Sequence, residues 1–418
     1  MSSGNMDLVT SVIVGLICCR WAMQQWLEWI NRRHVSRSST RIPAGLEGVM
    51  NSATYARSVA YTLAKSRVQQ FEIAWDAVVL CVALFSSVLP RGMEWFQSVF
   101  GNSTWSMAGY LFTVGLAVAM LGLPWSWHDQ FVLEERFGFN NSTQRIWWMD
   151  RLKGLLLALL LGYPLIVLLL KLVEWTGPQW WVWGWGTMLV FQLLISVLAP
   201  VLILPLFNKL TPLPEGTLRE RLLKMAEKTR FRAQNIQVMD GSKRSRHSNA
   251  FFTGFGKFRK IVLFDTLVEQ LAEPEVEAVL AHEIGHYKRK HIPKMLAFST
   301  ASSFAGFWAL SVLAKQEWFY RSFGFEVGNI AAALLLFAFL SGLVSFWFSP
   351  LMHVWSRKYE YEADAFARAA TGGPAPLIEA LRKLNRENLS NMNPHPAYSG
   401  FYYSHPTLVE REQALAGR

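Results

Sequence analysis

The chain has 418 residues, enough for two or three soluble domains, but 52% of them are hydrophobic, including 19 Trp and 28 Phe. Apolar runs long enough to cross a bilayer exclude an ordinary soluble enzyme. The formal net charge of +11 does not indicate binding to nucleic acid, because Lys and Arg cluster between the apolar runs, where membrane topology accounts for them.

Seven apolar stretches predict seven transmembrane helices. The first lacks the basic start and small-residue cleavage site of a signal peptide, so we expect it to be retained. Pro90 is predicted to close the second stretch, which follows an amphipathic segment at 45–70. Prolines inside the fourth and fifth stretches predict bends that neighbouring helices can accommodate. The stretches lie at about 8–26, 73–89, 107–127, 152–173, 180–207, 295–314 and 329–352.

The loops predict the topology. Those after the first, third and fifth stretches are rich in Lys and Arg, whereas those after the second, fourth and sixth are short and hold few. The positive-inside rule then places the N-terminus outside and the polar segments in the cytoplasm. We divide the chain into helices 1–5 (1–207), a metalloprotease insertion (208–292), helices 6–7 (293–352) and a cytoplasmic tail (353–418).

The polar insertion is predicted to begin with a helix at 215–229 and to continue with short strands at 236–239, 250–252 and 260–264. It ends in a segment with acidic residues near its start and with Lys288-Arg289-Lys290 at its end. This charge pattern suits a helix, because it complements the helix dipole.

That helix contains His282-Glu283-Ile284-Gly285-His286, an H-E-x-x-H motif. Residues four apart share one face of a helix, so His282 and His286 can bind one ion. Glu283 lies one step round the helix, within reach of a water at that ion, and is predicted to be the general base of a zinc hydrolase. The alternative is a chance occurrence of a short motif, so a third protein ligand must be found elsewhere in the chain.

The tail supplies that candidate. Glu360 and Asp364 share one helix face, whereas Glu362 is predicted to point away. Glu360 is the predicted third ligand, and Asp364 is placed to accept the second N–H of a ligating histidine. The alternative is a solvated helix with ordinary acidic residues. Two histidines and a carboxylate favour Zn²⁺, one ion per chain.

Four blocks of sequence resemble the type I CAAX prenyl protease family, integral-membrane zinc metalloproteases that cut prenylated proteins near the C-terminus. The resemblance extends from about residue 42 to near the C-terminus. It implies an all-α polytopic membrane protein, with seven helices in a barrel around a chamber and a zincin-like metalloprotease domain bearing a small β-sheet. The blocks are 282–286, 356–364 (the S-R-x-x-E-x-x-A-D pattern), 242–252 running into 261–267, and 403–406.

The resemblance also implies roles that spacing does not reveal. Asn249 is expected on an edge strand, holding the substrate backbone together with Ala250 and Phe251. The alternative for Asn249 is a residue that satisfies its own turn at the end of a strand. His405 is expected to face the scissile carbonyl and to stabilise the oxyanion, although a lone structural histidine is the alternative. Arg411 is expected to support the site by pairing with a carboxylate.

Several polar residues receive less specific predictions. His247, His291 and His395 are predicted to be structural or surface residues. Glu134 and Glu135 follow the third apolar stretch, and we favour a solvated loop there. The family comparison suggests instead a loop packed against the catalytic domain.

Together these features predict a membrane-embedded zinc metalloendopeptidase in contact with the lipid bilayer. The substrate is a peptide or protein, and the resemblance implies a prenylated C-terminus. A bacterial host, which the chain would suit, would place it in the inner or plasma membrane, with quality control of membrane proteins as the alternative activity. A seven-helix transporter should carry polar groups at midplane, and an inactive scaffold should lack a ligand or the base, so we favour the protease.

Overall fold

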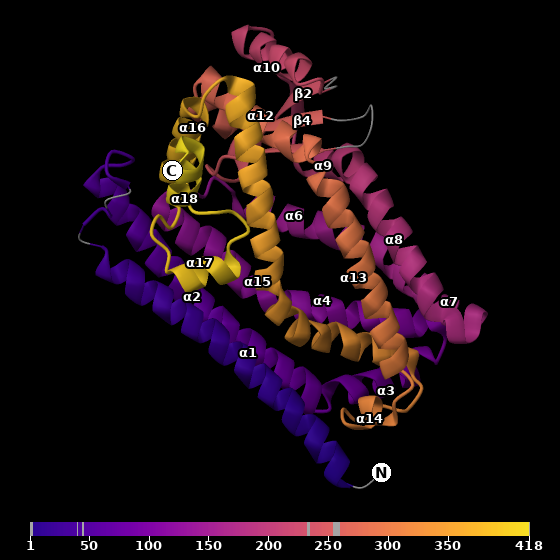
Figure 1. The fold of residues 1–418 in the computed structure, drawn as a ribbon. Helices are drawn as coiled ribbons and strands as arrows, with labels where there is room; N and C mark the ends of the chain where they lie inside the picture. The colour runs from indigo at the N-terminus through magenta and orange to yellow at the C-terminus, as the bar shows by residue number, and fades with distance from the viewer. Residues whose placement is uncertain (1–2, 40, 44–45, 232–234, 254–259, 418) are drawn as a thin grey trace.

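The computed structural model describes residues 3–39, 41–43, 46–231, 235–253 and 260–417. Long helices form most of the molecule, and a small sheet lies at one end with α10 and α12 (Figure 1). The helices before the sheet are α1 (Ser3–Arg37), α2 (Ser52–Phe85), α3 (Val88–Phe100), α4 (Thr104–His128), α5 (Glu135–Phe137), α6 (Gln144–Leu157), α7 (Tyr163–Thr176), α8 (Trp180–Leu198) and α9 (Leu204–Phe207).

The remaining helices build the end of the molecule that holds the sheet, which is the predicted catalytic end, and the last long apolar segments. α10 and α11 flank the strands, α12 carries the H-E-x-x-H motif, and α13 and α15 are long apolar helices. Their bounds are α10 (Thr217–Lys228), α11 (Asp265–Gln270), α12 (Glu273–Lys288), α13 (His291–Leu313), α14 (Glu317–Arg321), α15 (Ile330–Thr371), α16 (Ala375–Glu387), α17 (Pro396–Tyr402) and α18 (Leu408–Ala416).

Six helical stretches among the described residues are long and apolar enough to cross a membrane. One of them, Gln144–Phe207, spans 64 residues and contains both α7 and α8, which pack against each other after a turn at Gly177–Gln179. The prediction of a mainly helical polytopic membrane protein with a small sheet is confirmed. The count of seven crossings and the chamber stay predictions.

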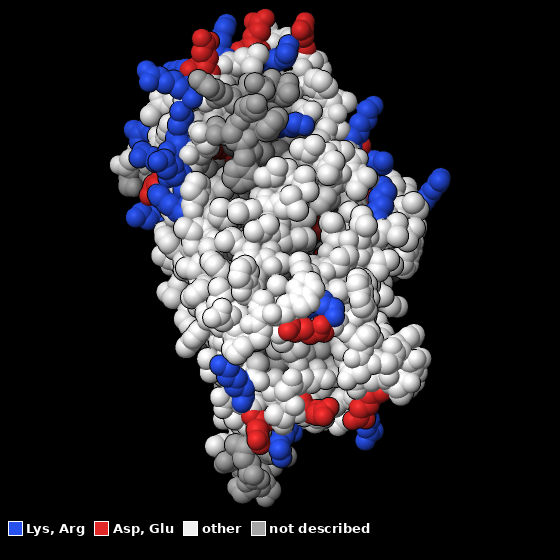
Figure 2. Space-filling model, turned by 90° about the vertical axis from the view of Figure 1, so that its right-hand side faces the viewer, with Lys and Arg blue, Asp and Glu red and all other residues white. Residues whose placement is uncertain are grey.

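The surface agrees with a membrane location. Figure 2 shows a broad region without charged side chains between two charged ends. Many large hydrophobic side chains on the long helices are exposed, such as Leu160 at 70% and Val190 at 66%. Such extensive apolar exposure is unfavourable in water and is expected where lipid tails are the solvent.

Proline positions show one wrong prediction. α2 continues through the predicted amphipathic segment and ends at Phe85, before the expected end of the second span. Pro90 lies in the first turn of the next helix, α3, where its missing N–H has no intrahelical partner to lose. Pro90 therefore does not close the span. Pro164 and Pro200 do lie beside or within π-helical turns, which mark irregular points in the fourth and fifth stretches.

The sheet contains four strands in the order β1-β2-β4-β3. β2 and β4 are parallel, and the two outer pairs are antiparallel, so β3 lies at an edge of the sheet. The three predicted strands are confirmed within one or two residues. β1 was not predicted, because it is only three residues long and ends in Pro212. The strands are β1 (Leu210–Pro212), β2 (Asn235–Met239), β3 (Ala250–Thr253) and β4 (Lys260–Phe264).

α15 connects the membrane region with the catalytic end. It is one helix of 42 residues, which corresponds to a length of about 63 Å at 1.5 Å per residue. The predicted boundary at 352–353 lies inside this helix, and the division of the chain into four segments stays a prediction. Because α15 continues past the membrane, it carries Glu360 and Asp364 to the face of α12.

Gly285 allows this contact. A Cβ at this position would lie 2.9 Å from the Cα and 3.1 Å from the carbonyl oxygen of Ala363 in α15. Both are backbone atoms, so a side chain at 285 cannot be accommodated by a rotamer change. The glycine of the motif is therefore required by helix packing, separately from the chemistry of its neighbours.

Gly285→Ala is expected to push α12 away from α15, lowering the free energy of unfolding by about 1–3 kcal/mol, as for other overpacked sites, and weakening metal binding. Thermal unfolding in detergent and metal content after dialysis would measure both effects. Gly154→Ala in α6 is the matched control, because no atom lies within 4 Å of its added Cβ. Equal stability and metal content of the two variants would contradict this account of the helix contact.

Candidate active site

α12 and α15 bring together the three residues predicted to bind a metal. His282, His286 and Glu360 each offer one ligand atom, and these atoms lie within 4.8 Å of one another. The two Nε2 atoms are 3.2 Å apart, and the Glu360 carboxylate oxygens lie 3.4 Å from Nε2 of His282 and 3.3 Å from Nε2 of His286. The i, i+4 spacing on α12 and the position of α15 together produce this convergence.

The chemistry of these groups fits a divalent cation. Glu360 is only 4% exposed, and among the described residues its Oε2 has no hydrogen-bond partner. Each histidine directs its Nδ1 outward to another side chain, so its Nε2 is left to face the carboxylate. Two imidazole nitrogens and a carboxylate at this separation match the donor set that zinc prefers.

Asp364 orients the first histidine. Its Oδ1 lies 2.8 Å from Nδ1 of His282, as the sequence predicted. Arg411 donates from Nε to Oδ2 of Asp364 at 2.8 Å and from Nη2 to Oδ1 at 2.5 Å, a bidentate pair in a buried position. Burial opposes protonation of His282, but the neighbouring carboxylates of Asp364 and Glu360 raise its pKa to about 9, so a metal ion competes with a proton there.

The partner of the second histidine was not predicted. His291 is 1% exposed, its Nδ1 lies 3.0 Å from Nδ1 of His286, and its Nε2 lies 3.1 Å from Glu362. Glu362, which was predicted to point away from the face of Glu360 and Asp364, is absent from the group of converging ligand atoms and contacts His291 instead. Lys290 has a left-handed backbone (φ 55°), which ends α12 and turns His291 back toward His286. A third histidine five residues after the motif was the available signal.

His291→Phe is expected to lower metal affinity about 10- to 100-fold, the usual cost of losing a partner that orients a ligand. The phenyl ring can keep the stacking on Tyr359, which lies at a centroid distance of 4.0 Å, but it cannot accept a hydrogen bond from Nδ1 of His286. Competition with a chromogenic chelator would measure the affinity.

Tyr359→Phe is the control, because the Tyr359 hydroxyl has no hydrogen-bond partner among the described residues, so its loss should leave affinity unchanged. If His291→Phe bound the metal as tightly as this control, the role of His291 would be refuted.

Glu283 lies on α12 between the two histidines and is partly buried. Burial raises the pKa of its carboxyl group above the ordinary value, although the nearby histidines oppose this shift. A carboxylate with a raised pKa is a stronger base, and a pKa closer to neutral suits general base catalysis.

His405 approaches the metal centre from the tail. Its Nε2 lies 3.4 Å from Oε1 of Glu360, and its Nδ1 lies 2.9 Å from the Ser404 hydroxyl. The side chain is 63% exposed, so it is accessible to a substrate. Since Ser404 can donate to Nδ1, the tautomer with a proton on Nε2 is available to donate toward the metal centre.

β3 is the strand that was predicted to pair with the substrate backbone. It packs near α12, and only one of its sides pairs, with β4, so its outer side is free among the described strands. Asn249 lies just before β3, and its Oδ1 accepts a hydrogen bond from the Ala250 N–H at 2.8 Å. This is the local turn contact that the sequence allowed as the alternative for Asn249. Binding of substrate by Asn249, Ala250 and Phe251 stays a prediction.

The loop around Glu134 packs against the catalytic end. Glu134 accepts a hydrogen bond from the Tyr61 hydroxyl and lies 3.1 Å from Nε2 of His247. Asn140 forms a β-bridge with Ser245. Glu134 is thus half-buried and packed as the family comparison suggested, so the favoured prediction of a solvated loop is wrong for Glu134, whereas Glu135 is exposed, in agreement with it. His247 has the structural place that was predicted for it.

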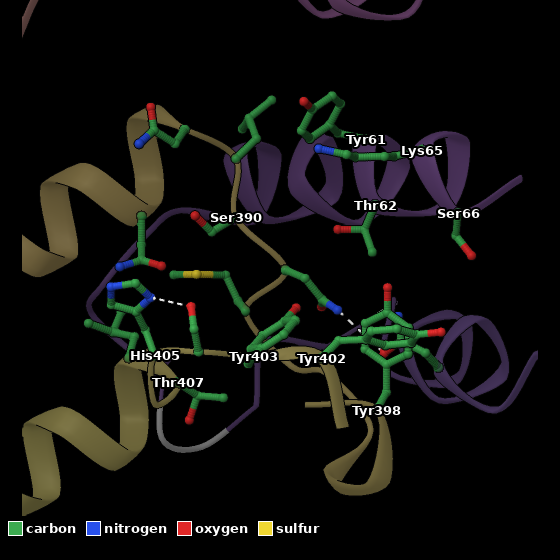
Figure 3. Close-up of a pocket in the computed structure, with 18 of the residues that line it drawn as sticks. Tyr61, Thr62, Lys65, Ser66, Ser390, Tyr398, Tyr402, Tyr403, His405 and Thr407 are labelled. Atoms are coloured by element: carbon green, nitrogen blue, oxygen red, sulfur yellow. Dashed lines mark hydrogen bonds between the residues drawn. The ribbon is translucent and has the colours of Figure 1, made fainter. Parts of the chain in front are cut away.

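A cavity of about 720 Å³ opens beside His405 and Arg411. It continues between α1, α2 and the tail, where Tyr61, Lys65 and Tyr402 line it (Figure 3). A volume of this size can hold a short peptide.

Comparisons with known proteins agree with the site. Residues 31–209 match the family model described as CAAX prenyl protease N-terminal, five membrane helices, and residues 212–418 match peptidase family M48. The CAAX prenyl protease 1 homolog of Oryza sativa subsp. japonica is 36% identical, covering 92% of each chain. CAAX prenyl protease 1 of Saccharomyces cerevisiae is 35% identical and covers 97% of this chain and 94% of its own.

A solved structure is also similar. The crystal structure of S. mikatae Ste24p aligns with a TM-score of 0.90 at 33% identity, and the alignment covers 97% of this chain and 98% of that one.

Proposed function

Because the chain belongs to peptidase family M48 and is an integral-membrane metalloendopeptidase, we propose that it cuts proteins with prenylated C-terminal CAAX sequences. The observation that carries the proposal is the convergence of His282, His286 and Glu360 on α12 and α15, with a cavity beside His405 and with β3, whose outer side is unpaired among the described strands, in contact with α12. The relatives named as CAAX prenyl proteases support the substrate class.

We propose that His282, His286 and Glu360 hold one Zn²⁺ ion. When bound, zinc supplies a Lewis acid that makes water acidic near neutral pH and polarises a carbonyl group. Asp364 and His291 fix the ring orientations of the two histidines from opposite sides, and Arg411 holds Asp364.

The side chains around this centre then have separate tasks. Glu283 takes the proton of the attacking water on its carboxylate and later passes it to the leaving amine. His405 donates from Nε2 to the oxygen that becomes negatively charged. The edge of β3 pairs with the substrate backbone as an added strand and holds the scissile bond in place. None of these steps requires a covalent bond between the substrate and a side chain of the protein.

The catalytic end is proposed to face the cytoplasm, with the N-terminus outside, because the loops after the first, third and fifth apolar stretches are rich in Lys and Arg and the polar insertion follows the fifth. This orientation would give the site access to proteins whose C-termini are modified in the cytoplasm. A C-terminal reporter that is active only outside the membrane would contradict it.

The substrate proposal is tested with detergent-purified protein and two fluorogenic CAAX peptides, one farnesylated and one without the lipid. We expect cleavage of the farnesylated peptide with the higher kcat/KM, loss of cleavage with a chelator, and recovery with zinc. Equal cleavage of both peptides would refute recognition of the prenyl group. Cleavage of neither peptide by zinc-loaded protein would refute the CAAX substrate class.

A further inference from the structure

The cavity beside His405 contains one cation that forms no salt bridge with a carboxylate of the described residues and interacts only at longer range with Glu134 and Asp129. Its lining includes two basic side chains, Lys65 and Arg411. Arg411 is engaged with Asp364 through two hydrogen bonds. Lys65 is exposed, its Nζ lies 5.8 Å from the centre of the Tyr61 ring, and it forms no ion pair with any carboxylate of the described chain.

The acidic side chains that line the cavity have other partners. Glu134 accepts a hydrogen bond from Tyr61 and pairs with His247. Glu28 is 2% exposed and accepts hydrogen bonds from Ser66 and, at 2.9 Å, from Tyr398. The hydrogen bonds of both carboxylates are thus supplied by groups other than Lys65, so its ammonium group can bind an incoming anion.

From this arrangement we propose that the cavity receives the C-terminal three residues of the substrate and that Lys65 binds their terminal α-carboxylate. The inference rests on the proposed function. In Figure 3, His405 and Lys65 lie on opposite sides of the cavity, so a peptide with its scissile bond near His405 would extend toward Lys65.

The chemistry of the cavity distinguishes the two halves of a CAAX substrate. The half that carries the prenyl group is large and apolar, and it continues into a folded protein. The other half is a tripeptide with one charged end and aliphatic side chains. The cavity offers tyrosine hydroxyls and Lys65 for the charged end, and Leu389, Met392 and Leu408 for aliphatic groups. Its volume of about 720 Å³ suits the tripeptide.

The test compares kcat/KM for a farnesylated CAAX peptide with a free C-terminus and for the same peptide with a C-terminal amide, which removes the charge. Wild-type protein is expected to prefer the free acid roughly 10- to 100-fold, the range for a hydrogen bond between charged groups. Lys65→Met should lose this preference by cleaving the free acid as slowly as wild type cleaves the amide. Lys65→Arg should restore part of it.

Arg67→Met is the matched control, because Arg67 is exposed on the same helix but does not line the cavity. This variant should keep the wild-type preference for the free acid. Metal content and thermal unfolding would confirm that each variant is folded. If wild type cleaves both peptides equally, or if Lys65→Met keeps the full preference, the inference is wrong although the proposed function stands. If wild type cleaves neither peptide, the proposed function fails and the inference fails with it.

Discussion

Glu283→Gln is expected to lower kcat for peptide cleavage by about 100- to 10,000-fold, the contribution of a well-placed general base. The amide keeps the size of the side chain but cannot accept the proton of the attacking water. Glu283 lies beside the two histidines on α12 and is absent from the group of three converging ligand atoms. Zinc content should therefore remain at one ion per chain, and the loss should appear in turnover.

Glu269→Gln is the matched control for this variant. Glu269 is an exposed carboxylate on α11, a few residues before α12. The Glu269→Gln enzyme should therefore cleave the peptide at the wild-type rate. Metal analysis and steady-state kinetics on the same preparations separate the two readouts. A Glu283→Gln enzyme with near-normal kcat would exclude Glu283 as the base, whereas one without zinc would reassign Glu283 to metal binding.

Glu360→Gln is expected to weaken metal binding strongly and to lower activity with it. The substitution leaves the volume unchanged but removes the negative charge that lies 3.3 Å and 3.4 Å from the two histidine nitrogens. Loss of an outer partner typically costs 10–100-fold in metal affinity, so loss of a ligand should cost roughly 100-fold or more. Titration of the chelator-treated protein with zinc would measure this effect.

The comparison with Glu283→Gln gives this prediction its control. Both variants replace a glutamate by glutamine within a few ångströms of the same histidines, yet only Glu360→Gln should lose zinc. If Glu360→Gln retains one zinc with wild-type affinity, the third ligand has been assigned to the wrong residue. Excess zinc should restore part of the activity of the Glu360→Gln enzyme. It should not raise the activity of the Glu283→Gln enzyme.

Much of the metal centre could be predicted from short spacings. His282 and His286 are four residues apart on one helix, and Glu360 and Asp364 are four apart on another, so each pair faces one direction. The resemblance then linked the two helices and added His405. The structure brings ligand atoms of His282, His286 and Glu360 within 4.8 Å of one another, with Asp364 against Nδ1 of His282 and His405 3.4 Å from Glu360. The roles of these residues stay predictions.

The partner of His286 could not be found in this way. Its position depends on the left-handed backbone of Lys290, a residue type that carries no strong preference for that conformation. The contact also requires α15 to place Glu362 against His291, a meeting of segments 71 residues apart. Spacing within one helix predicts which side chains share a face, but it does not predict which tertiary partner meets them.

The extent of the helices was also hard to predict from hydropathy. A sharp fall in hydropathy suggested that the seventh span ends near residue 352, but α15 continues to Thr371 because its polar part packs on α12 and α16. The same holds for α2, in which an amphipathic segment and an apolar one form a single helix. Hydrophobic patterning reports the surroundings of a helix, and tertiary contacts decide where the helix ends.

The continuity of α15 has a functional consequence. One continuous helix, which contains Pro350 and bends along its course (Figure 1), carries both membrane-embedded residues and the predicted third ligand, so a displacement of its upper part would move Glu360 relative to α12. The tight approach at Gly285 opposes such a movement. We therefore expect detergents that disturb the long helices to lower metal retention as well as stability.

Zinc K-edge X-ray absorption of the purified protein, combined with metal quantification, tests the central claim most directly. The account predicts one zinc per chain with two imidazole nitrogens at about 2.0–2.1 Å, oxygen ligands at about 2.0–2.2 Å and no sulfur. The imidazole signal should fall in His286→Ala. A sulfur shell at about 2.3 Å would contradict the assignment. In that case the three cysteines of the chain would be the ligands to consider. An unchanged spectrum in His286→Ala would also contradict the assignment, because another histidine would then supply the imidazole signal.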